Sequence, residues 1–145
     1  MNIDKYKHTH VDILRRIDSL RDLTRAGVVP NAAAIAQGII AMASVIKLHL
    51  SAEDQALYPA LQRSGDAELS RLSDRFQEEM GPIAAAFDGF VRRWNTAQRL
   101  RDNEAQFRQE ANSVLRRVYE RMKHEDQHFY PRIEAQYERH VALAA

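Results

Sequence analysis

Four segments of this 145-residue chain carry apolar residues at alternating spacings of three and four, the period of one face of an α-helix. Groups of helix-breaking residues separate the segments, among them Gly27-Val28-Val29-Pro30-Asn31 and Ser64-Gly65-Asp66. The predicted helices span about residues 4–26, 31–63, 66–95 and 103–141. Connections this short make consecutive helices antiparallel, so we expect an all-α, up-down-up-down four-helix bundle that forms a single domain over 1–145.

The charge balance and the lack of cysteine exclude several classes of function. Lys plus Arg number 21 against 20 for Asp plus Glu, and a net charge of +1 argues against electrostatic binding to nucleic acid or an anionic membrane. Without cysteine the chain has no disulfide, iron–sulfur cluster or thiol catalysis. The first residues start no apolar run, and the apolar stretches look too short to cross a bilayer. We therefore expect a cytoplasmic protein with neither nucleic-acid nor membrane partners; the sequence identifies no protein partner.

Ionisable residues occupy several positions where the helical period calls for an apolar one. These residues are His10, His49, Glu53, Arg121 and Glu125. Burying each of them would cost several kcal/mol unless it were paired or bound to a metal ion. At a rise of ~1.5 Å per residue, their distances from the helix ends differ by about one turn. The sequence therefore predicts that they meet at one level of the core.

The pair His49 and Glu53 is the centre of this pattern. The two residues are four apart, which places both side chains on the same helix face. An inward His and Glu at this spacing suits a hard or borderline cation such as iron or manganese. HxxxE alone is a weak signal, because chance matches are common in helical proteins. A second inward histidine, His10, and a second carboxylate, Glu125, at the same depth make it a strong indication of a metal site.

Two stretches resemble the paired helix motifs of the hemerythrin-like (HHE cation-binding) domains. They are His49–Pro59 and Glu125–Pro131, and the position of His10 in the first helix fits as well. The resemblance covers nearly the whole chain. It implies a four-helix bundle with a non-haem di-iron site that serves oxygen binding, oxygen or redox sensing, or iron or peroxide handling. It also implies that His10, His49, Glu53 and Glu125 are the metal ligands.

Met80 and Arg121 depart from the family pattern, because both stand where the family has a histidine. A thioether is a poor ligand for iron or manganese, and a guanidinium stays charged and has no lone pair to offer. Both departures fall on the same half of the two-metal site. We expect the Arg121 charge to stand in for the second metal, in a bidentate pair with Glu125 or in contact with Glu53.

Three interpretations follow from these departures. The favoured one is a single ion held by His10, His49, Glu53 and Glu125. In the second, the same groups form a buried polar network without metal, and the protein is a helical sensor or interaction module. In the third, a two-metal site is completed by His128, Glu79 or His124, although both of these histidines read better as exposed helix residues.

Iron is the expected metal, one ion rather than two, with manganese or zinc as alternatives. The expected small-molecule partners are O2, peroxide or NO, and whether a reaction is catalysed stays open. Pro59, Pro82 and Pro131 are expected to kink their helices. Tyr58 and Tyr130 precede two of these prolines and are interpreted as shaping the kinks, with hydroxyls that reach a neighbour.

Overall fold

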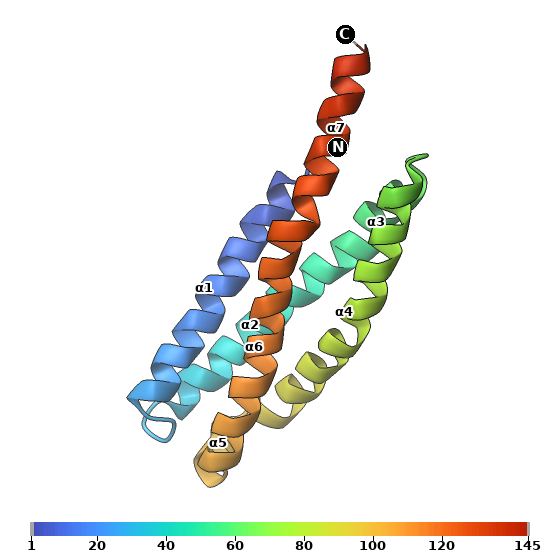
Figure 1. Ribbon diagram of the computed structural model, residues 1–145. Helices are drawn as coiled ribbons and strands as arrows, with labels where there is room; N and C mark the ends of the chain where they lie inside the picture. Colours follow the sequence, from blue (N-terminus) through green and yellow to red (C-terminus); the bar gives the residue numbers. More distant parts are fainter. Residues whose placement is uncertain (1, 145) are drawn as a thin grey trace.

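The computed structural model describes residues 2–144, and every regular element in that range is a helix (Figure 1). The elements are α1 (Asp4–Ala26), α2 (Ala32–Ala52), the π-helical turn η1 (Glu53–Leu57), α3 (Tyr58–Gln62), α4 (Ala67–Trp94), α5 (Ala97–Asp102), α6 (Glu104–His128) and α7 (Tyr130–Ala144). Successive long helices run in opposite directions, and α1 and α4 each pack against both α2 and α6. The predicted all-α bundle is thereby confirmed.

The helix ends follow the turn signals of the sequence. Gly27 ends α1 with φ 134°, a backbone conformation that residues with a Cβ rarely adopt, and its N–H bonds back to Leu23 O. Asp66 begins α4 by accepting a hydrogen bond from the Leu69 N–H at 3.0 Å. The stretch predicted to connect the third and fourth helices contains the short helix α5, which the fully buried Leu100 anchors in the core.

The three internal prolines have different effects. Pro82 lies inside α4, which continues through it. Before Pro59 the backbone widens into η1, where the Tyr58 N–H bonds to Glu53 O, five residues back. Before Pro131 the chain leaves α6 at Phe129 and resumes as α7. A proline ring clashes with the carbonyl four residues earlier, and the π turn and the break both relieve that clash.

The core consists of two apolar clusters on either side of a polar layer. The larger cluster fills the end of the bundle near the α1–α2 connection and α5, and it includes Ile17, Ile39, Phe90 and Phe107. The smaller one lies toward the α3–α4 connection and includes Leu57, Phe76, Phe129 and Tyr130. Along each helix the ionisable residues fall between the two clusters. This position keeps them out of water while leaving them next to one another.

The second helical rod, Ala32–Gln62, corrects one expectation about membranes. By length and composition it is apolar enough to cross a bilayer, with a mean hydropathy of 1.6 in its best window, of which 33% is buried inside the bundle. The unbroken apolar runs of this rod are short, but an alanine-rich window that contains the charged Lys47 is apolar enough on average. The core helix of a bundle passes the same test, so the absence of a membrane partner stays a prediction.

Candidate metal centre

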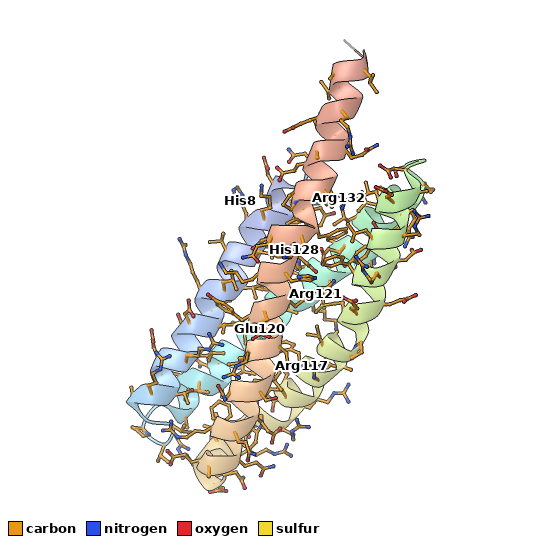
Figure 2. All side chains as sticks on the ribbon, in the orientation of Figure 1. His8, Arg117, Glu120, Arg121, His128 and Arg132 are labelled. Carbon is orange, nitrogen blue, oxygen red and sulfur yellow. The ribbon has the colours of Figure 1, made fainter. Side chains whose placement is uncertain are left out.

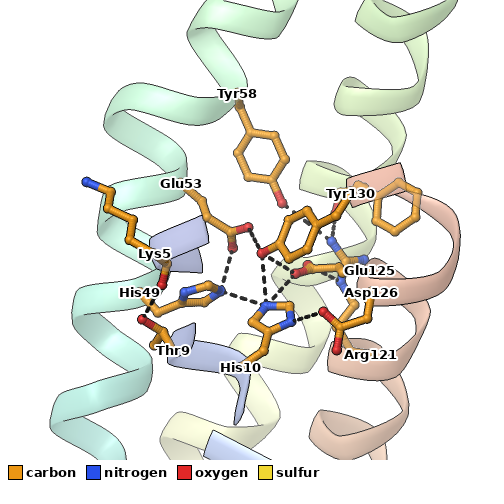
Figure 3. A network of polar contacts seen from close by, with 11 residues as sticks. Lys5, Thr9, His10, His49, Glu53, Tyr58, Arg121, Glu125, Asp126 and Tyr130 are labelled. Carbon is orange, nitrogen blue, oxygen red and sulfur yellow. Dashed lines mark hydrogen bonds and ion pairs between the residues drawn. The ribbon is translucent and has the colours of Figure 1, made fainter. Parts of the chain in front are cut away.

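Four side chains from three helical rods converge in the polar layer (Figure 3). His10 comes from α1, His49 from the last turn of α2, Glu53 from η1 and Glu125 from α6. Each is at most 4% exposed, and their ligand atoms all lie within 4.8 Å of one another. The structure thus brings together the four residues that the sequence analysis proposed as ligands.

The distances within this cluster match those between ligands of one ion. His10 Nε2 lies 3.0 Å from both His49 Nε2 and Glu125 Oε1, and His49 Nε2 lies 3.2 Å from Glu53 Oε1. Donor atoms bound to one cation at about 2.1 Å stand roughly 3.0 to 3.4 Å apart, along the edges of an octahedron or tetrahedron. The spacing therefore suits a single ion at the centre of the four residues.

Glu53 provides a second sign that the cluster fits a cation. Its Oε1 atom is buried and accepts no hydrogen bond from the residues that the structure describes, although His49 Nε2 lies 3.2 Å away. A buried carboxylate oxygen without a donor is costly in a folded protein. A cation bound to Oε1 would remove that cost.

Asp126 sets the orientation of His10, and the sequence analysis missed it. The Nδ1–H of His10 donates to Asp126 Oδ1 at 2.8 Å, which leaves Nε2 directed at the cluster. A carboxylate behind a ligating histidine fixes the ring and raises its basicity. Burial alone would lower the pKa of His10, but the hydrogen bonds and charges of Asp126 and Glu125 outweigh it and raise the pKa to about 9. Without metal, His10 is therefore protonated at neutral pH.

The two carboxylates differ in their surroundings. Burial raises the pKa of Glu53, and the nearby charge of Glu125 adds to this, although His49 acts in the opposite direction. Burial would raise the pKa of Glu125 as well, but the hydrogen bond from His10 and the charge of Arg121 hold it below its usual value. Glu125 is thus the carboxylate that stays ionised. Glu53 needs a further positive charge nearby before its ionised form is equally favoured.

Arg121 supplies the fixed positive charge of the site, and it lies between α6 and α4 (Figure 2). Its Nε donates to Glu125 Oε2 at 2.7 Å and its Nη2 donates to the Phe76 carbonyl at 2.6 Å. The guanidinium also lies over the Phe76 ring at 4.7 Å. The expected pair with Glu125 exists but runs through Nε rather than in bidentate form, because Nη2 is committed to Phe76 and lies 3.5 Å from the Tyr58 hydroxyl instead of reaching Glu53.

The residues considered for a second metal lie outside the cluster. Met80 is buried, but Glu79, His124 and His128 are exposed. Glu79 and His124 line a surface hollow of about 380 Å³ whose wall includes Arg121. The His124 ring stacks on Phe76 and lies 4.9 Å from the ring of His128. The helical register turns these three residues away from the core and from the four-residue cluster, and their part in a second metal site stays a prediction.

Tyr130 belongs to the site, which the sequence analysis did not indicate. Its hydroxyl reaches a neighbour as predicted, and its neighbours are the candidate ligands, His10 Nε2 at 3.0 Å and Glu53 Oε2 at 3.1 Å. Burial and the charges of Glu125 and Glu53 raise the pKa of Tyr130, so it remains a neutral donor without metal. The available signal was Pro131, which breaks the helix and so changes the direction of the preceding side chain.

The fold and the site together define a helical bundle whose buried His/Glu cluster could bind a metal ion. The family model described as Hemerythrin HHE cation binding domain matches residues 1–133, and the chain belongs to this family. No curated protein sequence and no solved structure matches it significantly.

Proposed function

We propose that the protein binds one iron ion through His10, His49, Glu53 and Glu125 and serves in oxygen, redox or iron response. The observation that carries this proposal is the convergence of two imidazoles and two carboxylates, all buried, at the spacing of ligands around one cation. Membership in the family supports metal binding in general. Manganese and zinc accept the same donor types and are the alternatives to iron.

The preference for one ion over two rests on Arg121. Its guanidinium is bonded to Glu125 and occupies the helix position at which the family has a histidine. A fixed positive charge there repels a second cation and already neutralises one carboxylate. Met80 removes a further ligand from the same half of the site.

A bound iron ion would supply one-electron redox chemistry and a coordination position for O2, peroxide or NO. Reversible O2 binding that takes one electron from each of two irons does not suit a single ion. The chain's own residues bind and orient the ion: Asp126 holds the His10 ring, and Arg121 holds Glu125. The apolar clusters on either side keep the four candidate ligands at most 4% exposed. A cytoplasmic location without nucleic-acid or membrane partners belongs to the same proposal.

A second candidate function is a metal-free helical sensor or interaction module. It is favoured by the number of contacts that the polar groups make among themselves, including His10 to Asp126 and Arg121 to Glu125. Such a network satisfies most of the buried groups without an ion. Among the described residues of the site, Glu53 Oε1, which accepts no hydrogen bond, speaks directly against it.

Metal analysis separates the two candidates. The protein is purified without chelator, and its iron, manganese and zinc are measured per chain before and after anaerobic addition of Fe(II). We expect about one ion per chain in the parent and none in His49→Ala, because that change removes a buried ligand. His124→Ala is the matched control, since it removes an exposed histidine and should retain the ion. A parent that stays metal-free after Fe(II) addition would favour the module, and two ions per chain would overturn the single-ion site.

A further inference from the structure

The Tyr130 hydroxyl is placed as a ligand would be. The residue is fully buried, and its oxygen lies 3.0 Å from His10 Nε2, 3.1 Å from Glu53 Oε2 and 3.4 Å from Glu125 Oε1. Figure 3 shows the hydroxyl directed at these groups from the side of α7. Its distances to them are the same roughly 3.0 to 3.4 Å that separate donor atoms on one cation. The hydroxyl oxygen therefore lies at the same spacing as the four candidate donor atoms and can be counted as a fifth donor.

The backbone break at Phe129 makes this position available. Glu125 and Tyr130 are five residues apart, which in a continuous α-helix would turn their side chains about 140° from each other. The end of α6 and the new start at α7, enforced by Pro131, change that relation and bring the two oxygens within 3.4 Å. The Tyr130 ring is then held between His10, at 4.9 Å, and Phe129, at 5.9 Å. A ring fixed on two sides directs its hydroxyl without further loss of side-chain entropy.

The charge of the layer also calls for an anionic ligand. Glu53 and Glu125 contribute two negative charges and Arg121 one positive charge, and all three are at most 4% exposed. The histidines must be neutral to bind metal. Together with the Asp126 carboxylate that holds His10, a divalent ion would make the layer neutral, and a ferric ion would leave it with one net positive charge. Uncompensated charge in a buried layer is unfavourable, and a phenolate would reduce it.

We propose that Tyr130 is a fifth metal ligand and binds the ion through its phenolate oxygen; this rests on the proposed metal-binding function. Binding breaks the Tyr130 O–H bond and forms a metal–oxygen bond. The proton passes to Glu53 Oε2, which accepts the hydrogen bond at 3.1 Å, and then leaves to solvent, while no electron is transferred. Tyr58 does not share this role, because its hydroxyl is directed at Arg121.

The test uses the colour of the ferric protein. The full chain is loaded with Fe(II), metal content is measured, and the iron is oxidised with one equivalent of ferricyanide. A tyrosinate ligand gives Fe(III) a charge-transfer band in the visible spectrum, and resonance Raman excitation within it enhances the tyrosinate ring vibrations. We expect the band in the parent, its loss in Tyr130→Phe and its retention in Tyr58→Phe and in Tyr6→Phe, because Tyr58 and Tyr6 are also buried near the site. Mn(II) affinity, which needs no redox step, should fall about 10-fold or more in Tyr130→Phe, since loss of even an outer partner costs that much.

Three outcomes would overturn the inference. An iron-loaded parent without the band would mean that Tyr130 is a hydrogen-bond donor only, and the proposed function would stand. A band that persists in Tyr130→Phe would have the same meaning for Tyr130. A parent that binds no metal would overturn the proposed function together with the inference, and the metal measurement distinguishes that case. Should Tyr130→Phe fail to fold, the Raman spectra of the parent, of Tyr58→Phe and of Tyr6→Phe still decide the question.

Discussion

Two stretches of the chain with nearly the same pattern make opposite contributions to the polar layer. His49–Pro59 and Arg121–Pro131 both carry Glu-Asp-Gln and then Tyr-Pro at the same spacing. Both place a buried glutamate and a buried tyrosine at the level of the site. They differ at the first position, which is histidine in one and arginine in the other. The comparison teaches that one residue decides whether a stretch adds an imidazole ligand to its glutamate or a fixed positive charge beside it.

The surroundings of the two stretches reinforce the difference. His10 of α1 contacts both stretches, because its Nε2 lies 3.0 Å from His49 Nε2 and 3.0 Å from Glu125 Oε1. Arg121, in contrast, packs against Phe76 of α4. The Phe76 carbonyl accepts a hydrogen bond from the guanidinium, and the Phe76 ring lies against the guanidinium in a cation–π contact. Beyond Arg121 the surface hollow begins. Arg121 therefore separates the candidate metal position from this part of the surface.

The largest expected effect comes from removing the built-in cation. Arg121→Ala removes one of the two positive partners of Glu125, leaving only His10 at 3.0 Å, and removes the side-chain donor to the Phe76 carbonyl. Breaking a buried ion pair on one side typically costs ~3–5 kcal/mol. We expect a loss of that size in the free energy of unfolding of the metal-free protein, measured with urea.

Two variants sharpen this result. Arg117→Ala, one turn earlier on α6 and exposed, should change the free energy of unfolding by no more than about 0.5 kcal/mol. Arg121→His restores a neutral ligand beside Glu125 and should raise the metal content above that of the parent. If Arg121→Ala proved as stable as the parent, the argument that its charge replaces a metal would lose its support.

The next effect is the pH dependence of the metal-free protein. Because the pKa of His10 is raised to about 9, its charged form contributes stability that is complete below about pH 6.5 and lost as the pH rises through 9. The raised pKa of Glu53 acts in the same direction. The free energy of unfolding should fall between pH 6.5 and 9.5 by roughly 3 kcal/mol at most. His10→Gln should flatten this slope, and a slope that persists in that variant would exclude His10 as its source.

The fold and the four central side chains were predictable because they depend on helical period alone. A buried face at spacings of three and four fixes which residues point inward, so His10, His49, Glu53 and Glu125 could be placed at one level. Their ligation of a metal stays a prediction. The same period correctly identified Arg121 as an inward residue, although not the atom with which it meets Glu125.

Tyr130 and Asp126 could not be placed in this way, and each for its own reason. The period assigns Tyr130 to a different face from Glu125, and only the break before Pro131 turns it inward. Asp126 is adjacent to Glu125 and its side chain is 32% exposed, so the period puts it at the edge of the site. Its role arises from the position of the His10 ring on another helix, which a local pattern does not encode.

A smaller effect on metal affinity is expected from changing Asp126. This residue is not a proposed ligand, and its contact with His10 has no counterpart among the described contacts of the other stretch. Asp126→Ala removes the acceptor of the His10 Nδ1–H and should weaken metal binding by ~10–100-fold. The matched control is Asp54→Ala, at the equivalent place in the other stretch, where the carboxylate is exposed and accepts only from Gln77. Mn(II) titration of both variants measures the difference. Equal losses in the two would mean that the effect is one of surface charge and not of His10 orientation.

The smallest effect is expected from the exposed histidines of α6, and it tests the single-ion site from outside. His124 and His128 are one turn apart with rings 4.9 Å from each other, so they resemble a ligand pair when seen alone. They lie outside the buried cluster, however, and His124 packs on Phe76. Replacing both with Gln should leave the iron bound per chain at one equivalent of Fe(II) unchanged, and the free energy of unfolding within about 0.5 kcal/mol. A drop in bound iron would mean that His124 or His128 binds metal at the surface. Arg121 would then no longer explain why the two stretches differ.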